Sequence, residues 1–396
     1  MIKQISASQL AIGMFVHDLN CGWMAHPFLT NQFAVKDTAT IRKILDAGIR
    51  EVSIDTSRGA DLAGEQKAVA VLAESAKQIE PAAPILIPPA PLAEELQRAR
   101  KLHHDANKLV SGLMHDIRLG KQIEVEQCEP LVAGIIDSIF RMPSALLPLA
   151  QVKTRDEYTF QHSVSVAALS VAFGRALELP RDVIQELALG GLLHDVGKAL
   201  VPPAVLGKPG KLTDAEFVVM KHHAAQGAEL LENLPGISEI AFQAAAQHHE
   251  RFDGSGYPHG LKGDAISIYG QMMAIVDVYD AITSLRVYHK GIPPTEALKS
   301  MFEWSGTQFN PRLVQAFIKS IGIYPAGSLV RMASGKIGIV REVVPSKLLQ
   351  PVVKVFYHAD KRCYLDPETI DLSAAQDKIV AHESFEKWGI DQARWL

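Results

Sequence analysis

The sequence predicts a mainly α protein in which a bundle of helices lies between a small α+β module and a β-rich tail. Apolar residues recur with helical spacing through residues 125–320, whereas the segments on either side carry short alternating runs broken by glycine and proline. A stretch rich in alanine and proline separates the first module from the rest. We therefore divide the chain into an N-terminal module (1–65), a linker (66–91), a connecting helix (92–120), a helical domain (121–322) and a β-rich C-terminal extension (323–396).

The N-terminal module carries short runs with strand character and one helical segment. Strands are expected at residues 14–16, 28–29, 33–35 and 52–54, and a helix at residues 38–45. Residues 92–119 then continue as one long helix with a single apolar stripe among many charged side chains. The stripe indicates packing on a neighbouring element of the same chain, and a homodimer formed through this helix is the alternative.

The spacing of apolar residues predicts the helices of the helical domain and the strands of the tail. Helices are expected at residues 125–140, 156–177, 182–194, 214–231, 237–249, 267–285 and 294–304, with a last one from Pro311. Thr213 and Asn310 stand where N-caps are expected. In the tail, strand-like runs flank the turn at Ser334-Gly335, and residues 352–357 supply a further strand.

Composition limits the classes of function. The chain of 396 residues has 21% charged residues and a formal net charge of −4, which does not predict a surface for duplex nucleic acid. Its three cysteines, Cys21, Cys128 and Cys363, are too few and too widely spaced for a disulfide framework. The first apolar run, residues 10–16, is too short for a signal peptide or a membrane-inserted segment, so we expect a cytoplasmic protein.

The pair His194-Asp195 closes an apolar helical run and is the strongest candidate for metal chemistry. Adjacent histidine and aspartate offer a neutral nitrogen and an anionic oxygen, which suit borderline divalent metals. Other His-Asp pairs occur in more polar surroundings, at residues 17–18, 104–105 and 115–116. What distinguishes His194-Asp195 is the set of similar groups on the helices that follow.

Five helical segments carry groups that can bind a metal on otherwise apolar surroundings. These groups are His162, His194, Asp195, His223, His248, His249 and Asp277. Taken singly, each group has a simpler explanation, as a hydrogen-bonded core histidine or as a carboxylate on a helix face. An unpaired aspartate within the apolar run around Asp277, however, would cost several kcal/mol to bury, so it needs a cation.

The number of candidate ligands exceeds what one metal site takes, and we therefore expect two divalent ions. The division that we expect is His162, His194 and Asp277 on one ion and His223, His248 and His249 on the other, with Asp195 bridging. Two such ions suit the in-line hydrolysis of a phosphate ester. The loop after His249 contains Gly254, Gly256 and Pro258, which favour a tight turn that projects Tyr257 towards the site.

These motifs resemble the HD-GYP family of bacterial phosphodiesterases, which hydrolyse cyclic di-GMP. The resemblance rests on HDxGK at 194–198 and HHExxDGxGYP at 248–258, and it extends over roughly residues 125–320. It implies an HD-type metal-dependent phosphohydrolase bundle. The N-terminal module resembles a domain of unknown function that often precedes HD-GYP domains, and the tail resembles a β extension found in many of them.

Carried over position by position, the resemblance implies roles for individual residues. It assigns metal ligation to the seven groups named above and catalytic roles to Asp195 and Lys198, the lysine lying near the scissile phosphate. Substrate contacts are implied for Lys198, Tyr257, Asp280 and Arg286. Some family members hold a third metal through a glutamate at the position of Tyr158, so its absence here favours two ions.

The leading hypothesis is a metal-dependent phosphodiesterase that converts cyclic di-GMP to linear pGpG and, in a second round, to GMP. One alternative is a catalytically silent cyclic di-GMP receptor that acts through protein contacts, for which the Gly-Tyr-Pro loop would be the docking element. Another is an HD phosphohydrolase acting on a different nucleotide or cyclic dinucleotide. The ligand types leave the metal open among iron, manganese, nickel, cobalt and zinc.

Overall fold

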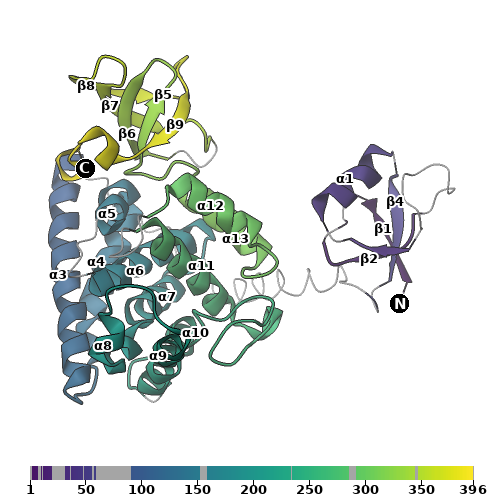
Figure 1. Ribbon diagram of the computed structural model, residues 1–396, viewed down its shortest axis with the longest axis horizontal. Helices are drawn as coiled ribbons and strands as arrows, with labels where there is room; N and C mark the ends of the chain where they lie inside the picture. The colour runs from purple at the N-terminus through teal and green to yellow at the C-terminus, as the bar shows by residue number, and fades with distance from the viewer. Residues whose placement is uncertain are drawn as a thin grey trace. The chain divides into compact units, whose positions relative to one another are not determined.

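The computed structural model falls into two compact units, residues 1–84 and 85–396. It describes residues 2–7, 10, 12–19, 32–35, 37–47, 49–55, 58, 91–151, 158–232, 234–284, 291–343 and 347–395 (Figure 1). The boundary between the units lies in the stretch predicted as a linker. No helix in these ranges is both long enough and apolar enough to cross a bilayer.

The first unit is a small antiparallel sheet with one helix. Its strands pair in the order β1-β4-β2-β3, with bounds β1 Ile2–Ser6, β2 Phe15–Asp18, β3 Phe33–Ala34 and β4 Glu51–Asp55. Helix α1 (Thr38–Asp46) begins where the Asp37 carboxylate accepts a hydrogen bond from the Thr40 backbone N–H at 2.7 Å. The alternating side chains of β4 bury Val52 and Ile54, which is why that strand was predictable. β1 was not predicted, and the strand expected at residues 28–29 lies outside the described residues.

The second unit is a helical bundle followed by a sheet (Figure 1). Its helices begin with α3 (Leu92–Arg118), α4 (Glu129–Arg141), α5 (Pro143–Gln151), α6 (Tyr158–Ala176) and α7 (Arg181–Leu193). They continue as α8 (Pro203–Leu206), α9 (Asp214–Glu232), α10 (Glu239–Ala246), α11 (Ile268–Thr283), α12 (Pro294–Glu303) and α13 (Pro311–Ile321). Short 3₁₀ turns, η2 (Val125–Gln127), η3 (Val196–Leu200) and η4 (Gly263–Ala265), connect some of them.

Most of the predicted helices are confirmed, with ends displaced by a few residues. Both predicted caps form: the Asn310 side chain accepts the Arg312 N–H at 3.0 Å, and Thr213 and Glu216 bond each other reciprocally at the start of α9. α5 was missed because Pro148 lies inside it, and a proline there argues against a helix.

Helix α3 runs along the bundle and is packed against it. The stripe facing α4, α5, α6 and η3 is buried, with Ala99, Ala106, Val110 and Met114 nearly inaccessible. Of the two interpretations of this stripe, packing within the chain is therefore the one that the structure supports. The stripe gives no support to a homodimer, because the protein's own helices cover its apolar face, and a dimer through this helix stays a prediction.

The C-terminal extension is an antiparallel sheet with strand order β8-β7-β6-β5-β9. Its strands are β5 (Leu329–Met332), β6 (Lys336–Glu342), β7 (Val352–His358), β8 (Cys363–Asp371) and β9 (Ile379–Glu383), and the short helices α14 (Phe385–Trp388) and α15 (Gln392–Trp395) follow. Trp395 stacks on Phe356 at 3.9 Å between ring centres and so closes one face of the sheet. Gly335, at φ +79°, makes the predicted turn between β5 and β6.

Candidate metal centre

The structure brings all seven candidate metal ligands to one place in the bundle. His162 comes from α6, His194 and Asp195 from the end of α7, and His223 from α9; His248 and His249 follow α10, and Asp277 lies on α11. All are buried except His249, whose side chain is 22% exposed. α7 and α11 are apolar nearly all round, as expected of helices at the centre of a bundle.

Gly197 allows the His194-Asp195 segment to lie directly against α9. A Cβ added at Gly197 would lie 2.0 Å from the carbonyl oxygen of His223 and 2.6 Å from the backbone nitrogen of Gly227. These distances are shorter than any non-bonded contact, so only glycine fits. The glycine of HDxGK therefore sets the spacing between Asp195 and His223.

Asp195 lies between two groups of histidines and turns one oxygen towards each. Its Oδ2 lies 3.4 Å from Nε2 of His194 and 3.7 Å from Nε2 of His162. Its Oδ1 lies 3.4 Å from Nε2 of His223 and 3.9 Å from Nε2 of His248. A carboxylate in this position can serve two ions at once.

Asp277 occupies the opposite side of the same cluster. Its Oδ1 lies 2.9 Å from Nε2 of His162 and 3.9 Å from Nε2 of His194, whereas its Oδ2 lies 3.7 Å from Nδ1 of His249. The Nε2 atoms of His249 and His223 are 3.1 Å apart. The ligand atoms of all seven residues thus converge on a small volume.

The outward-facing nitrogens of the histidines are held by hydrogen bonds. Nδ1 of three of them lies against the carbonyl oxygen of the residue three positions earlier: His194 on Gly191 at 2.7 Å, His223 on Met220 at 2.5 Å and His248 on Ala245 at 2.5 Å. A proton on Nδ1 that is donated to a carbonyl leaves Nε2 with a lone pair facing the cluster. The three rings are thereby oriented as metal ligands.

Several buried atoms of the cluster lack a hydrogen-bond partner, and this tests whether a metal fits. Nε2 of His194, Nε2 of His248 and Oδ1 of Asp195 are buried without one. Leaving such groups unpaired is costly, whereas a divalent cation would satisfy all three. The metal-competent triads found in the described ranges all fall within this cluster: His162/His194/Asp277, His223/His248/His249 and His194/Asp195/His248.

The protonation states also suit a metal. Burial lowers the pKa of His223, His248 and His249, that of His249 to about 3, so these rings are neutral at pH 7. Burial alone would raise the pKa of Asp195, but Lys198 and His194 outweigh it and hold that pKa well below its usual range. Asp277 is likewise an anion, because His162 and His249 outweigh the effect of burial on its pKa.

His194 is the exception among these histidines. Burial lowers its pKa, but the neighbouring carboxylates of Asp195 and Asp277 outweigh burial and the pKa is raised. Negative charge therefore dominates the part of the cluster around His194. A bound cation would replace the proton that His194 otherwise attracts.

Lys198 and Tyr257, both predicted to act on the substrate, lie at the edge of this cluster. Nζ of Lys198 is 2.5 Å from Oδ2 of Asp195, and its side chain is 22% exposed. The Tyr257 ring lies 4.6 Å from that of His249, centre to centre. Burial and the charge of Asp277 raise the pKa of Tyr257, so its phenol stays protonated and can donate a hydrogen bond.

The Gly-Tyr-Pro loop is held by a residue for which no role was predicted. Glu250 is 2% exposed, and its carboxylate accepts hydrogen bonds from the backbone N–H groups of His259 at 2.8 Å and Leu261 at 2.9 Å. Gly256 packs so tightly that an added Cβ would lie 2.3 Å from the Arg251 nitrogen. The signal that could have identified Glu250 is its place directly after the histidine pair, facing a loop whose N–H groups need acceptors.

Asp280 and Arg286 were also predicted to contact the substrate. Asp280 is fully buried, and its Oδ2 lies 2.6 Å from Nδ1 of His162, on the side of that ring away from Asp277. The prediction that Asp280 faces the substrate is therefore corrected: its carboxylate supports a ligand histidine. Arg286 lies outside the described residues, and its role stays a prediction.

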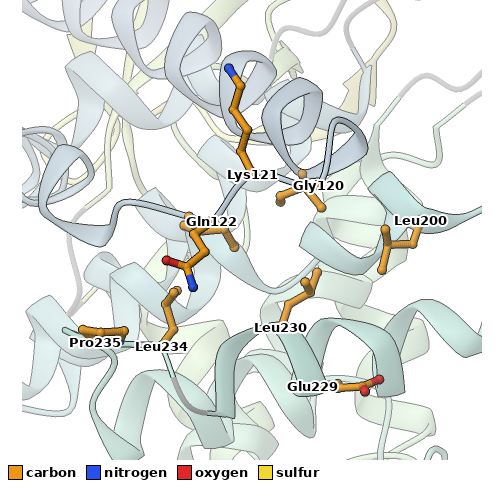
Figure 2. Close-up of a pocket in the computed structure, with 10 residues that line it drawn as sticks. Gly120, Lys121, Gln122, Leu200, Glu229, Leu230, Leu234 and Pro235 are labelled. Carbon is orange, nitrogen blue, oxygen red and sulfur yellow. The ribbon is translucent and has the colours of Figure 1, made fainter.

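The structure also contains a pocket of about 400 Å³ between the end of α3, η3 and the end of α9 (Figure 2). It is lined by Ile117, Gly120, Lys121, Gln122, Ile123, Leu200, Glu229, Leu230, Leu234 and Pro235. None of the seven candidate ligands is among them. The walls are mainly apolar, so this pocket is distinct from the histidine–aspartate cluster.

Comparison with known proteins agrees with this arrangement. Residues 145–313 match the HD domain family, and residues 2–128 match a domain of unknown function, DUF3391. The cyclic di-GMP phosphodiesterase PA4108 of Pseudomonas aeruginosa is 41% identical over 399 residues, which cover 98% of this chain and 94% of that protein.

Two shorter matches cover the helical domain in part. A cyclic di-GMP phosphodiesterase of Thermotoga maritima is 37% identical over 185 residues, 46% of this chain and 50% of that protein. The 3′3′-cGAMP-specific phosphodiesterase 1 of Vibrio cholerae is 38% identical over 160 residues, 40% of this chain and 37% of that protein.

Proposed function

Because this chain belongs to the HD-GYP family of cyclic di-GMP phosphodiesterases, we propose that it hydrolyses cyclic di-GMP at the histidine–aspartate cluster. The product is linear pGpG, and a second round gives GMP. The observation that carries the proposal is the cluster itself, in which buried imidazole and carboxylate atoms converge and three of them lack hydrogen-bond partners. The identity of 41% to a cyclic di-GMP phosphodiesterase, over nearly the full length of both chains, supports this substrate.

We propose that two divalent ions are held here. His162, His194 and Asp277 would hold one, His223, His248 and His249 the other, and Asp195 would bridge them. The support is that the two oxygens of Asp195 face different histidine groups. When bound, such a pair polarises a phosphoryl oxygen and supplies a nucleophile from water. Mixed imidazole and carboxylate ligands suit manganese or iron.

The chain's own residues complete the site. The Lys198 ammonium lies beside Asp195 and stabilises negative charge that develops on the phosphoryl oxygens. The protonated Tyr257 phenol donates a hydrogen bond at the edge of the cluster. Arg286, predicted to bind phosphate through its guanidinium fork, completes the substrate contacts in this proposal.

The test measures turnover and metal content on the same samples. Purified protein is loaded with Mn²⁺ or Fe²⁺, and cyclic di-GMP and 3′3′-cGAMP are followed by chromatography for the wild type and for Asp195→Ala. Asp105→Ala is the matched control, because it alters another His-Asp pair, exposed on α3. We expect Asp195→Ala to lose metal and turnover and Asp105→Ala to keep both.

The other outcomes separate the alternatives. A metal-loaded wild type that binds cyclic di-GMP and leaves it intact would identify a receptor. If the protein hydrolyses 3′3′-cGAMP faster than cyclic di-GMP, its substrate preference is that of its Vibrio cholerae relative. Full turnover by Asp195→Ala would refute the assignment of the site.

A further inference from the structure

The edge of the metal centre next to Tyr257 carries a charge and a ring that the proposed chemistry does not use. Phe217 and Lys221 lie one turn apart on α9. Nζ of Lys221 is 5.4 Å from the centre of the Phe217 ring and 5.9 Å from the centre of the Tyr257 ring. Since Tyr257 in turn lies against His249, a continuous row of side chains leads from the metal ligands to the surface.

The charge of Lys221 is not neutralised within the parts of the chain that the structure describes. Its contacts there are the two aromatic rings, and it has no acidic partner. The nearby cation Lys198 is paired with Asp195, whereas the Lys221 ammonium is available to an incoming anion. An ammonium on an aromatic face at an exposed site is held only weakly, so it can turn to a phosphate, with which it makes a charge-assisted hydrogen bond.

The ring of Phe217 is unusually open for a large apolar side chain. It is 49% exposed, and its neighbour Val218 is 48% exposed. An exposed ring beside a free ammonium matches a ligand that has both a flat base and an anionic group. A nucleotide has both.

We propose that Phe217 and Lys221 form the subsite for the second nucleotide of the cyclic dinucleotide, an inference that rests on the proposed function. The substrate has two phosphates, and the metal cluster with Lys198 takes the one that is cleaved. Lys221 neutralises the phosphate that is not cleaved, and the Phe217 ring stacks on a base. The pair thereby selects cyclic dinucleotides over phosphodiesters with a single phosphate.

The alternative is that Phe217 and Lys221 only stabilise α9 as a surface pair four residues apart. Lys221→Met separates the two roles, because methionine keeps an unbranched apolar chain against Phe217 and removes the charge. Phe217→Leu keeps an apolar side chain and removes the stacking ring. Matched controls are Lys319→Met, at an exposed position on α13, and Phe302→Leu, whose ring is 54% exposed on α12.

The experiment measures binding and turnover separately on metal-loaded full-length protein. Binding is titrated calorimetrically with a phosphorothioate analogue of cyclic di-GMP, and turnover is measured with cyclic di-GMP and with bis(p-nitrophenyl) phosphate, which has one phosphate. We expect Lys221→Met and Phe217→Leu each to raise Kd and KM about tenfold for the cyclic dinucleotide. Neither should change kcat or the hydrolysis of bis(p-nitrophenyl) phosphate, and Lys221→Met should weaken the salt dependence of Kd.

The outcomes distinguish this inference from the proposed function. If the wild type hydrolyses cyclic di-GMP and both variants match their controls, the subsite is refuted and the function stands. If the wild type binds the analogue but leaves cyclic di-GMP intact, and Lys221→Met weakens binding, the hydrolase is refuted and the subsite stands. A loss of bis(p-nitrophenyl) phosphate hydrolysis in Lys221→Met would also overturn the subsite, because it would show damage to the metal centre.

Discussion

His162 is held between two carboxylates of the same helix, with Nε2 2.9 Å from Asp277 and Nδ1 2.6 Å from Asp280. In the three other oriented histidines of the cluster, Nδ1 is hydrogen-bonded to a backbone carbonyl oxygen instead. A carboxylate in that position makes the ring a stronger ligand than a carbonyl does, because its full charge stabilises the proton on Nδ1. His162 is therefore the ligand most dependent on a side chain outside the cluster.

Replacing that carboxylate should weaken metal binding without unfolding the protein. Asp280→Asn keeps the volume and an acceptor oxygen but removes the charge, and we expect metal affinity to fall about 10–100-fold. The measurement is a competition titration with a chromogenic chelator. Asp264→Asn, at an exposed position in η4, should bind as the wild type does. Unchanged affinity in Asp280→Asn would mean that Asp280 does not tune His162.

The packing of η3 on α9 gives a second prediction. Gly197→Ala would bring a Cβ to 2.0 Å from the His223 carbonyl oxygen, so the two elements must separate. We expect the free energy of unfolding to fall by about 3 kcal/mol, with loss of bound metal. Thermal unfolding and metal analysis measure both. Gly112→Ala on α3, where nothing lies within 4 Å of the new atom, should be neutral or slightly stabilising.

Glu250 should control the loop and leave the metal in place. Glu250→Gln turns an amide N–H₂ towards backbone groups that are themselves donors, which costs about 1–3 kcal/mol for the loop conformation. We expect KM for cyclic di-GMP to rise about tenfold with metal content unchanged. Glu232→Gln, exposed at the end of α9, is the control. A variant that also lost its metal would contradict a role confined to the loop.

The cluster also predicts how the metal-free protein responds to acid. The pKa of His249 is about 3 in the folded chain, against 6.5 in the unfolded chain, and the pKa values of His223 and His248 are lowered as well. The unfolded chain therefore binds more protons between these values, and stability falls as the pH drops below 6.5. His194 acts in the opposite direction: its raised pKa adds stability that is full below 6.5 and is lost as the pH rises through the folded-state pKa.

The pKa is lowered for three of these histidines and raised for one. The net effect is therefore a loss of stability on acidification. Below about pH 4 the loss should steepen, since Asp195 and Asp277 contribute stability that is present above 3.8 and lost as these groups protonate. Thermal unfolding across this pH range measures it. His249→Asn should flatten the slope, and His104→Asn, exposed on α3, should leave it unchanged. A Tm that rose on acidification would contradict the prediction.

The sequence predicted most of the bundle because its helices have clear apolar periodicity. It could not identify β8, whose side chains are largely exposed on both faces and do not alternate. It grouped the candidate ligands because each lies within or beside an apolar run. Asp277 and Asp280 are three residues apart and share a face of α11, so spacing alone could not tell which meets the metal and which lies behind His162.

Both ends of α3 are fixed to the bundle. In its first turn the buried Glu95 bonds Ser138 at 2.9 Å and Arg141 at 2.8 Å, and in its last turn Arg118 donates to the Ala199 carbonyl at 3.4 Å, next to Lys198. Rotating the helix about its axis would break the buried ion pair, at a cost of about 3 kcal/mol or more. Any movement that α3 transmits to the segment of Lys198 must therefore be a tilt or a lengthwise shift, and not a rotation about the helix axis.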